Sequence, residues 1–286
     1  MTEPVAFTDS GLGEWTEEHV FEVTAERIAE YAAATNDPIP EHRAGKVAPP
    51  VFAVVPTFFS LAPAALEVAP VSLLGKLVHG EQDFHFRRPI RPGDVLTTRA
   101  RATGYAALST GSTVTVYAET VDAAGELVNE QWLAAFFRGV DAGATAGEQA
   151  PPHPLDDAVA EGRPLAEVTQ HIDEDQTFRY SPASGDPMPI HLDEEIARLS
   201  GLPGIINHGL CTMAFTSWAA LREFAGGDVG RLKRLAVRFA KPVLPGQDIT
   251  TRFWRLSADS EETSYGFATS AGSDLVIRDG LAVVTR

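Results

Sequence analysis

The sequence predicts an α+β protein built from two tandem copies of one unit, and three observations lead to this conclusion. Phe86–Arg99 aligns without a gap with Phe239–Arg252, at an offset of 153 residues. Asp37–His42 aligns with Asp186–His191 at an offset of 149 residues, in the same order along the chain. Each copy also combines one long apolar helical segment with segments of alternating apolar and polar residues, which are typical of half-buried strands. Two repeated blocks in one order indicate an ancestral unit that was copied once.

The elements of the two copies are expected in a similar order. A short helix over Ala25–Ala34 precedes the Asp–His turn of the first copy, and a long apolar helix follows that turn. Residues 1–145 and 161–286 form the two predicted domains, because the small, proline- and glycine-bearing residues between them lack periodicity and indicate a linker at 146–160. Strands are predicted over Val78–Phe86, Val95–Gly104, Ser112–Ala118, Leu127–Arg138, Arg234–Ala240, Asp248–Leu256, Glu262–Ala268 and Leu275–Val284.

Composition narrows the classes of function. The 286 residues carry a formal net charge of -16, and nucleic acid is not an expected partner because phosphate binding needs a basic face. A single cysteine excludes a disulfide framework and fits a reducing cytoplasm. The acidic start of the chain lacks a basic stretch followed by an apolar run, so we predict no secretory signal and a cytoplasmic location.

One uncharged segment, Val47–Leu66, passes a crude length test for a membrane helix. Its prolines, Pro49, Pro50, Pro56 and Pro63, make a spanning helix a poor interpretation, because proline breaks the backbone hydrogen-bond ladder. We therefore predict no membrane partner and a buried segment that lines an apolar cavity.

The residues that point to chemistry lie in the second copy. Asp186 and His191 stand five residues apart across a proline-rich turn, and His208-Gly209 opens an apolar helical segment. A carboxylate and an imidazole can act together as acid and base. The free N–H groups and the dipole of a helix N-terminus can hold an oxyanion, and Gly209 would let a substrate approach the backbone closely. These groups suffice to add water to an acyl thioester or to remove it.

Two blocks here resemble a known family. Ser184-Gly185-Asp186 with Pro189 and His191, followed by Ile206 and His208–Thr212, is similar to the pattern of the MaoC-like dehydratases, the (R)-specific enoyl-CoA hydratases or hydratase 2. The resemblance implies a double hotdog, in which two tandem hotdog units wrap an antiparallel sheet around long central helices. It also implies a hydro-lyase of fatty acid metabolism that reversibly hydrates a trans-2-enoyl thioester to the (3R)-3-hydroxyacyl thioester. Met188 replaces an Asn of the family pattern, so one polar group is missing.

The resemblance assigns roles to individual residues. Asp186 and His191 are the predicted acid/base pair, and Gly209 is the predicted oxyanion donor. The substrate is expected to be an acyl-CoA or an acyl-carrier-protein thioester, without a metal or another cofactor. The predicted substrate-binding residues are Tyr180, Ser184, Met188, His208, Arg238 and Lys241. Tyr180 and Ser184 would hold the geometry of the motif through hydrogen bonds. For His208 a structural role is preferred.

Five of the 23 basic residues lie within 11 positions, at Arg231, Lys233, Arg234, Arg238 and Lys241. They would bind the phosphates of CoA or an acidic carrier protein, or they would form a solvated strand edge. Elsewhere, His79 and His85 could face one way on a strand, but no third ligand accompanies them and no metal site is expected. No glycine-rich nucleotide fingerprint is found in the sequence.

The first copy keeps Asp37 and His42 but has Ala48–Phe52, with two prolines, where the second copy has its His-Gly block. Proline lacks the N–H that an oxyanion needs, so we expect a non-catalytic copy that shapes the acyl pocket, with a second working site as the alternative. Two other functions stay open: a hotdog acyl-thioesterase, and an inactive acyl-CoA-binding or scaffold protein. The second stays open because Met188 replaces the polar Asn of the family pattern. A homodimer is plausible because sheet edges favour pairing.

Overall fold

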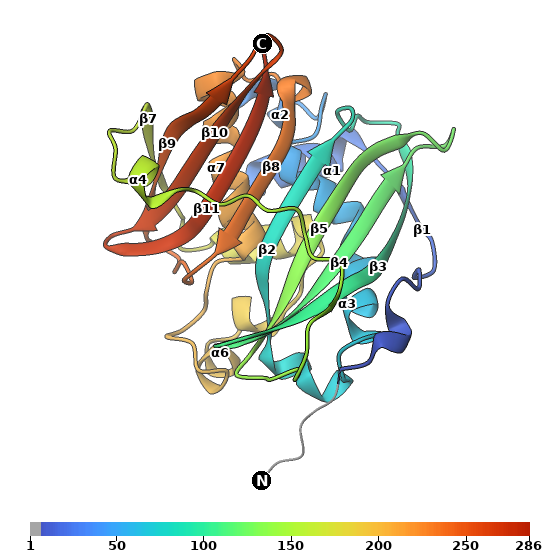
Figure 1. Cartoon of the computed structure of the whole chain (residues 1–286). Coiled ribbons are helices and arrows are strands. Elements are labelled where there is room, and N and C mark those ends of the chain that lie inside the picture. Colours follow the sequence, from blue (N-terminus) through green and yellow to red (C-terminus); the bar gives the residue numbers. More distant parts are fainter. Residues whose placement is uncertain (1–6) are drawn as a thin grey trace.

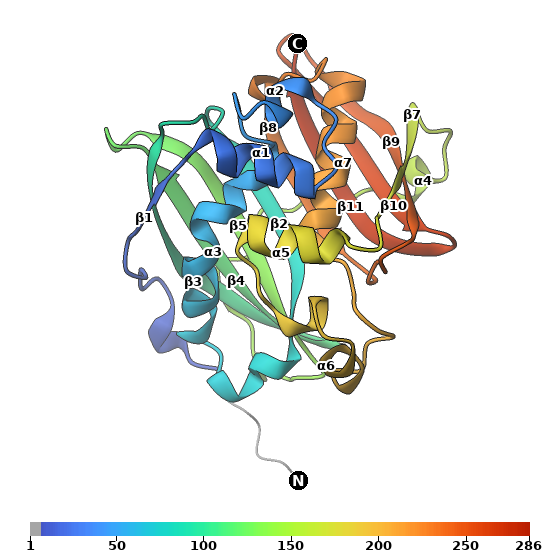
Figure 2. The same cartoon turned by 180° about the vertical axis from the view of Figure 1, so that it is seen from behind.

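The computed structural model describes residues 7–286, which form one antiparallel sheet with the longer helices gathered on one face (Figures 1 and 2). The sheet has 11 strands in the order β1-β3-β4-β5-β2-β8-β11-β10-β9-β7, and β6 pairs with β3 off this path. The two ends of this order belong to the two copies, which meet where β2 pairs with β8. This arrangement confirms the predicted α+β double hotdog.

The first copy contains strands β1 (His19–Glu22), β2 (Leu77–Phe86), β3 (Val95–Leu108), β4 (Gly111–Val121), β5 (Leu127–Arg138) and β6 (Ala146–Gly147), with helices α1 (Ala25–Ala34), α2 (Pro40–Arg43) and α3 (Val54–Leu66). The second contains β7 (Ala166–His171), β8 (Leu232–Phe239), β9 (Asp248–Ala258), β10 (Glu262–Ala271) and β11 (Asp274–Thr285), with α4 (Asp157–Ala160), α5 (Gln176–Ser184), α6 (Glu194–Leu199) and α7 (Gly209–Phe224). Short 3-10 helices are η1 (Asp9–Gly11), η2 (Pro50–Ala53), η3 (Val71–Lys76), η4 (Pro189–His191) and η5 (Val229–Arg231).

All eight predicted strands are present, with ends shifted by a few residues, and the helix over Ala25–Ala34 has the predicted bounds. The strands that the sequence did not indicate are the edge strands β1 and β7 and the two-residue β6. These segments are short, so they offer too few alternations for a periodic pattern to stand out.

The long helix of each copy lies against the inner face of the sheet. In α7 every residue from Leu210 to Leu221 is buried, which makes it a central helix with no solvent face. In α3 most side chains are buried too, as expected for Val47–Leu66, but Phe59 is 64% exposed and Ala62 and Pro63 are exposed as well. The cause is the helical period, which turns one side of α3 toward solvent. Among residues 7–286, no helix is long and apolar enough to cross a membrane.

A pseudo-twofold axis passes through the junction of the copies. β2 and β8 pair antiparallel from Glu81 opposite Arg238 to His85 opposite Arg234, and the pair at the centre is Asp83 and Ala236. These two central residues are separated by 153 positions, the same offset that aligns the copies in sequence. Equivalent positions of the copies therefore lie at opposite ends of the β2–β8 seam.

Residues of the predicted linker are ordered on the sheet. After β6, the chain crosses the outer face of the sheet, on the side away from the helices (Figure 1). His153 is buried there, with Nδ1 at 2.6 Å from the carbonyl oxygen of Asp279. The 146–160 segment therefore ties the first copy to the last strand of the second.

Candidate active site

The position of Asp186 is set by the end of α5. Gly185 ends this helix in a left-handed conformation, with φ of 81°, which glycine adopts without steric cost. One oxygen of the Asp186 carboxylate then accepts a hydrogen bond from the backbone N–H of Met188 at 3.0 Å. The Ser181 hydroxyl donates to the Asp186 carbonyl oxygen at 2.7 Å, and the Ser184 hydroxyl accepts from the Asp186 N–H at 3.3 Å. Both the side chain and the backbone of Asp186 are thus fixed by hydrogen bonds to neighbouring residues.

His191 is buried in η4, and its two ring nitrogens have different environments. Its Nδ1 lies 2.9 Å from the carbonyl oxygen of Ile206, so this nitrogen carries the proton and donates it. The Nε2 atom then keeps its lone pair and can act as a base. The ring stacks on that of His208, with 3.8 Å between centroids, and His208 Nε2 lies 3.3 Å from the Asp186 carbonyl oxygen.

Burial dominates the protonation of these groups. It raises the pKa of Asp186 and lowers the pKa of His191, while the attraction between the two charges opposes both shifts. Burial, helped by the charge of His191, lowers the pKa of His208 to about 2. His208 is therefore neutral at physiological pH and fills space beside His191.

Asp186, His191 and His208 each offer a ligand atom, and these atoms lie within 4.8 Å of one another. Of the described residues, this trio is the group that could hold a metal ion. One nitrogen of each histidine already faces a backbone carbonyl oxygen, so only the other nitrogen of each ring is left for a metal.

Gly209 begins α7, as predicted, and no side chain of residues 7–286 caps this helix end. The first N–H groups of a helix have no intrahelical acceptor, and the helix dipole favours negative charge beside them. A Cβ atom at Gly209 would stand 3.2 Å from the ring of Phe239. The ring of His79, from the first copy, meets Phe239 edge-on with 5.1 Å between centroids, and burial lowers the pKa of His79 to about 4.

Tyr180 and Met188 lie in different environments. The Tyr180 hydroxyl is 3.2 Å from the Tyr31 hydroxyl, deep between the copies, and its ring is tilted over His208 with 4.9 Å between centroids. Met188 is 40% exposed at the start of η4. Tyr180 thus supports the histidine stack with help from Tyr31, which our site prediction omitted although Tyr31 aligns with Tyr180 in the repeat.

The predicted phosphate contacts have other partners in the structure. Arg238 Nε lies 2.7 Å from a carboxylate oxygen of Glu81, and Lys241 Nζ lies 2.5 Å from one of Asp274. Both cations are about half exposed, so these ion pairs are solvated and weak. A role for Arg238 and Lys241 in CoA binding stays a prediction.

The first copy arranges its Asp and His differently. His42 Nδ1 lies 2.7 Å from a carboxylate oxygen of Asp37, and both side chains are buried. Each aspartate accepts a hydrogen bond from the backbone N–H two residues on, Asp37 from Ile39 and Asp186 from Met188. The copies differ at the histidine, because Nδ1 of His191 faces the carbonyl oxygen of Ile206 instead of the aspartate. Pro49 and Pro50 stand before α3, where neither can offer an N–H to an oxyanion.

The fold and the site together define a double-hotdog protein with an Asp–His pair beside a helix N-terminus. Comparison with known proteins names the family. A model described as MaoC like domain matches residues 157–273, and one described as FAS1-like, dehydratase domain region, matches residues 10–131. The second copy is therefore a MaoC-like domain, and the first matches a FAS1-like dehydratase region.

Several relatives agree with this assignment. A probable enoyl-CoA hydratase 2 from Dictyostelium discoideum is 28% identical over 73% of this chain and 70% of its own length. A peroxisomal multifunctional enzyme type 2 from Drosophila melanogaster is 32% identical over 71% of this chain, which spans only 36% of that longer protein. A MaoC-like dehydratase from Phytophthora capsici has the same fold, with a TM-score of 0.84, 24% identity, and coverage of 97% of this chain and 98% of that one.

Proposed function

We propose that this protein is a hydro-lyase that interconverts a trans-2-enoyl thioester and a (3R)-3-hydroxyacyl thioester at one site in its second copy. The observation that carries the proposal is the convergence of Asp186, with its raised pKa, on His191, whose Nε2 keeps a lone pair. Relatives named enoyl-CoA hydratase 2 and 3-hydroxyacyl-thioester dehydratase Y support the same reaction. The R configuration comes from the family resemblance.

Hydration begins with a water held between the Asp186 carboxylate and His191 Nε2. The pair removes one proton from this water while its oxygen bonds to C3 of the enoyl thioester. The electrons of the C2–C3 double bond move onto the thioester carbonyl, which becomes an enolate oxygen. One acid of the pair then returns a proton to C2, so that one water is consumed and no electron is gained or lost. Dehydration follows the same steps in reverse.

Gly209 would stabilise the enolate. Its N–H and the dipole of α7 act where negative charge develops, and one donor of this kind contributes about 3 kcal/mol to the transition state. The absence of a side chain lets the thioester reach the backbone. Asp186, His191 and water account for each proton transfer, so the proposed reaction needs no metal or other cofactor.

The first copy, residues 1–145, would shape the acyl pocket without catalysing the reaction. The direct Asp37–His42 hydrogen bond and the prolines at Pro49 and Pro50 support this role. The carrier would be CoA or an acyl carrier protein, and a homodimer would cover the open sheet edges. Relatives include peroxisomal proteins, and a cytoplasmic location for this chain stays a prediction.

The decisive experiment follows the loss of enoyl-thioester ultraviolet absorbance with crotonyl-CoA and with a longer 2-enoyl-CoA. Wild type is compared with Asp186→Asn and with its matched counterpart Asp37→Asn, and thermal unfolding checks that each variant folds. We expect Asp186→Asn to lower kcat by about 10²- to 10⁴-fold, and Asp37→Asn to keep most of the activity.

Each other outcome points to a different function. Loss of activity in Asp37→Asn alone would move the site to the first copy. Release of free thiol from the thioester would identify an acyl-thioesterase, because hydration leaves the thioester intact. Binding of enoyl-CoA without turnover by the wild type would identify an inactive acyl-CoA-binding protein, with Met188 as the first residue to examine.

A further inference from the structure

The chain that enters α7 carries three groups of the candidate active site in four consecutive residues. The carbonyl oxygen of Ile206 lies 2.9 Å from Nδ1 of His191, the ring of His208 stacks on that of His191, and Gly209 begins the helix. The direction in which this segment meets α7 therefore sets both the base and the oxyanion donor. Asn207 stands in the middle of the segment, and the proposed reaction gives it no role.

The side chain of Asn207 ties this segment to the helix. Its Nδ2 donates to Oγ1 of Thr212 at 3.0 Å, and the two residues are 2% and 3% exposed. The Thr212 hydroxyl in turn donates to the carbonyl oxygen of His208 at 3.4 Å. Asn207 precedes the N-cap residue and Thr212 is the fourth residue of α7. Apolar residues at these two positions often form a hydrophobic staple, which fixes the angle at which the chain enters a helix. Here a hydrogen bond replaces the apolar contact.

Stability alone does not account for this choice of residues. The Oδ1 atom of Asn207 is buried, and it has no hydrogen-bond partner among residues 7–286. A buried polar atom without a partner lowers stability, and an apolar pair at the same two positions would avoid that cost. A hydrogen bond is directional, whereas an apolar contact is not. The Asn207–Thr212 bond therefore specifies the geometry of the entering chain more closely than an apolar staple would.

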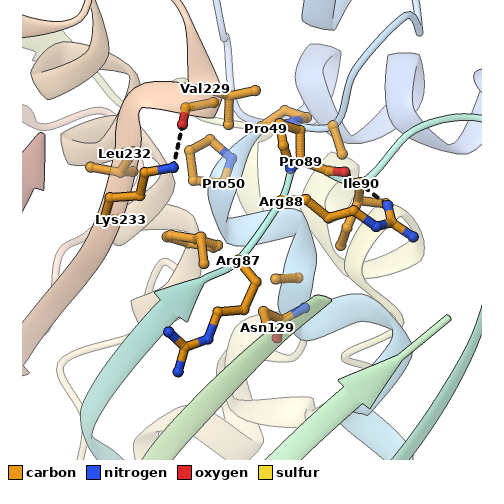
Figure 3. Close-up of a pocket in the computed structure, with 14 residues that line it drawn as sticks. Pro49, Pro50, Arg87, Arg88, Pro89, Ile90, Asn129, Val229, Leu232 and Lys233 are labelled. Atoms are coloured by element: carbon orange, nitrogen blue, oxygen red, sulfur yellow. Dashed lines mark hydrogen bonds between the residues drawn. The ribbon is translucent and has the colours of Figure 1, made fainter. Parts of the chain in front are cut away.

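The first copy enters its long helix with apolar residues. Pro49 and Pro50 of the corresponding segment line a narrow pocket together with Ile90 and Leu232 (Figure 3). In that copy Nδ1 of His42 pairs with the carboxylate of Asp37 and not with a carbonyl of the entering chain. The polar tie thus occurs in the copy whose histidine depends on that chain for its orientation.

We propose that Asn207 is a positioning residue of the hydratase reaction, because its bond to Thr212 fixes the chain that holds His191 and presents the Gly209 N–H. This inference rests on the proposed function. Asn207 acts through Ile206 and Gly209 and does not touch the substrate. Without the bond, the base and the oxyanion donor shift together, and a misplacement of about 1 Å costs about 100-fold in rate.

Four variants test the proposal by hydration of crotonyl-CoA, each beside thermal unfolding. Asn207→Leu and Thr212→Val each remove the hydrogen bond, and their double variant restores the contact as a hydrophobic staple. Thr251→Val is the matched control, since it removes a buried hydroxyl that lies 2.9 Å from that of Thr269 between β9 and β10. We expect each single change at the α7 entry to lower kcat about 10- to 100-fold, with KM changed less than about threefold. The double variant should regain most of kcat, and Thr251→Val should lose stability but keep kcat.

Nitrogen NMR of the histidine rings gives a readout that does not depend on turnover. It reports which ring nitrogen carries the proton, and His191→Gln identifies the signals of His191. The wild type and the double variant should show His191 protonated on Nδ1, where it faces the Ile206 carbonyl. Asn207→Leu and Thr212→Val should show a mixture of the two tautomers, because that acceptor has moved.

Each contrary result has a distinct meaning. A wild type that hydrates no enoyl-CoA would refute the proposed function, and the NMR comparison would still test how Asn207 orients His191. In an active enzyme, wild-type kcat in Asn207→Leu would refute the positioning role, as would an equal loss of kcat in Thr251→Val. A double variant that folds but stays as slow as Asn207→Leu would also overturn it, because the carboxamide itself would then be needed. Thr212→Val, which keeps the shape of the side chain, decides the question if Asn207→Leu fails to fold.

Discussion

Gly209→Ala separates the two roles that a helix-start glycine can have, as a packing residue and as an oxyanion donor. A Cβ at this position would lie 3.2, 3.3 and 3.4 Å from three ring atoms of Phe239. Carbon atoms prefer about 3.5–4.0 Å, so the ring must retreat by a few tenths of an ångström. Overpacking of this kind costs about 1 kcal/mol or somewhat more, while alanine regains about 0.5–1 kcal/mol over glycine in a helix. The net change in folding stability should be small.

The effect on catalysis should be much larger, because a side chain at this position would crowd a thioester that approaches the Gly209 N–H. Loss of one oxyanion donor lowers kcat by about 10²- to 10³-fold. The assay is hydration of crotonyl-CoA, followed by ultraviolet absorbance beside thermal unfolding of the same sample. Gly75→Ala is the matched control, since a Cβ there meets no atom of the described residues within 4 Å. A Gly209→Ala enzyme that folds normally and keeps the wild-type kcat would refute the oxyanion assignment.

Three further predictions follow from the site. Burial lowers the pKa of His191 and raises that of Asp186. We therefore expect kcat/KM to fall with decreasing pH between 3.8 and 6.5, the ordinary pKa values of an aspartic acid and a histidine side chain. A pH–rate profile in which kcat/KM already falls above pH 6.5 would contradict this. Dialysis against a chelator should leave the rate unchanged. A loss of activity that Zn²⁺ restores would instead place a metal on Asp186, His191 and His208. Tyr180→Phe should lower the free energy of unfolding in urea by about 1–3 kcal/mol, because the buried Tyr31 hydroxyl loses its partner; the double variant with Tyr31→Phe should lose less than the sum of the single changes.

The comparison of the copies explains why one site would stay active. Asp186 and His191 are each anchored to backbone groups, which leaves the base lone pair of His191 for water. Asp37 bonds His42 directly, so the same two residue types form a closed, buried pair. Identical spacing in the sequence thus supports two different arrangements.

Much of the architecture could be predicted from sequence because the signals are local. Alternation along Leu127–Arg138 and the helical period over Ala25–Ala34 depend only on which face each residue turns toward the core. The start of α7 at Gly209 was also predictable, since glycine beside an apolar run is a local feature. The repeat added the long-range result that two such units are joined.

Tertiary structure alone decided which groups meet across the copies. The Tyr31–Tyr180 hydroxyl pair joins residues 149 positions apart, and the partners of Arg238 and Lys241 lie on other strands. Likewise, the lack of a hydrogen-bond partner for the buried Asn129 carboxamide among residues 7–286 depends on what surrounds it after folding. Sequence spacing determines the direction of a side chain along its own element. The partner that it finds depends on how β2 and β8 pair, because contacts between distant residues exist only once the sheet has closed.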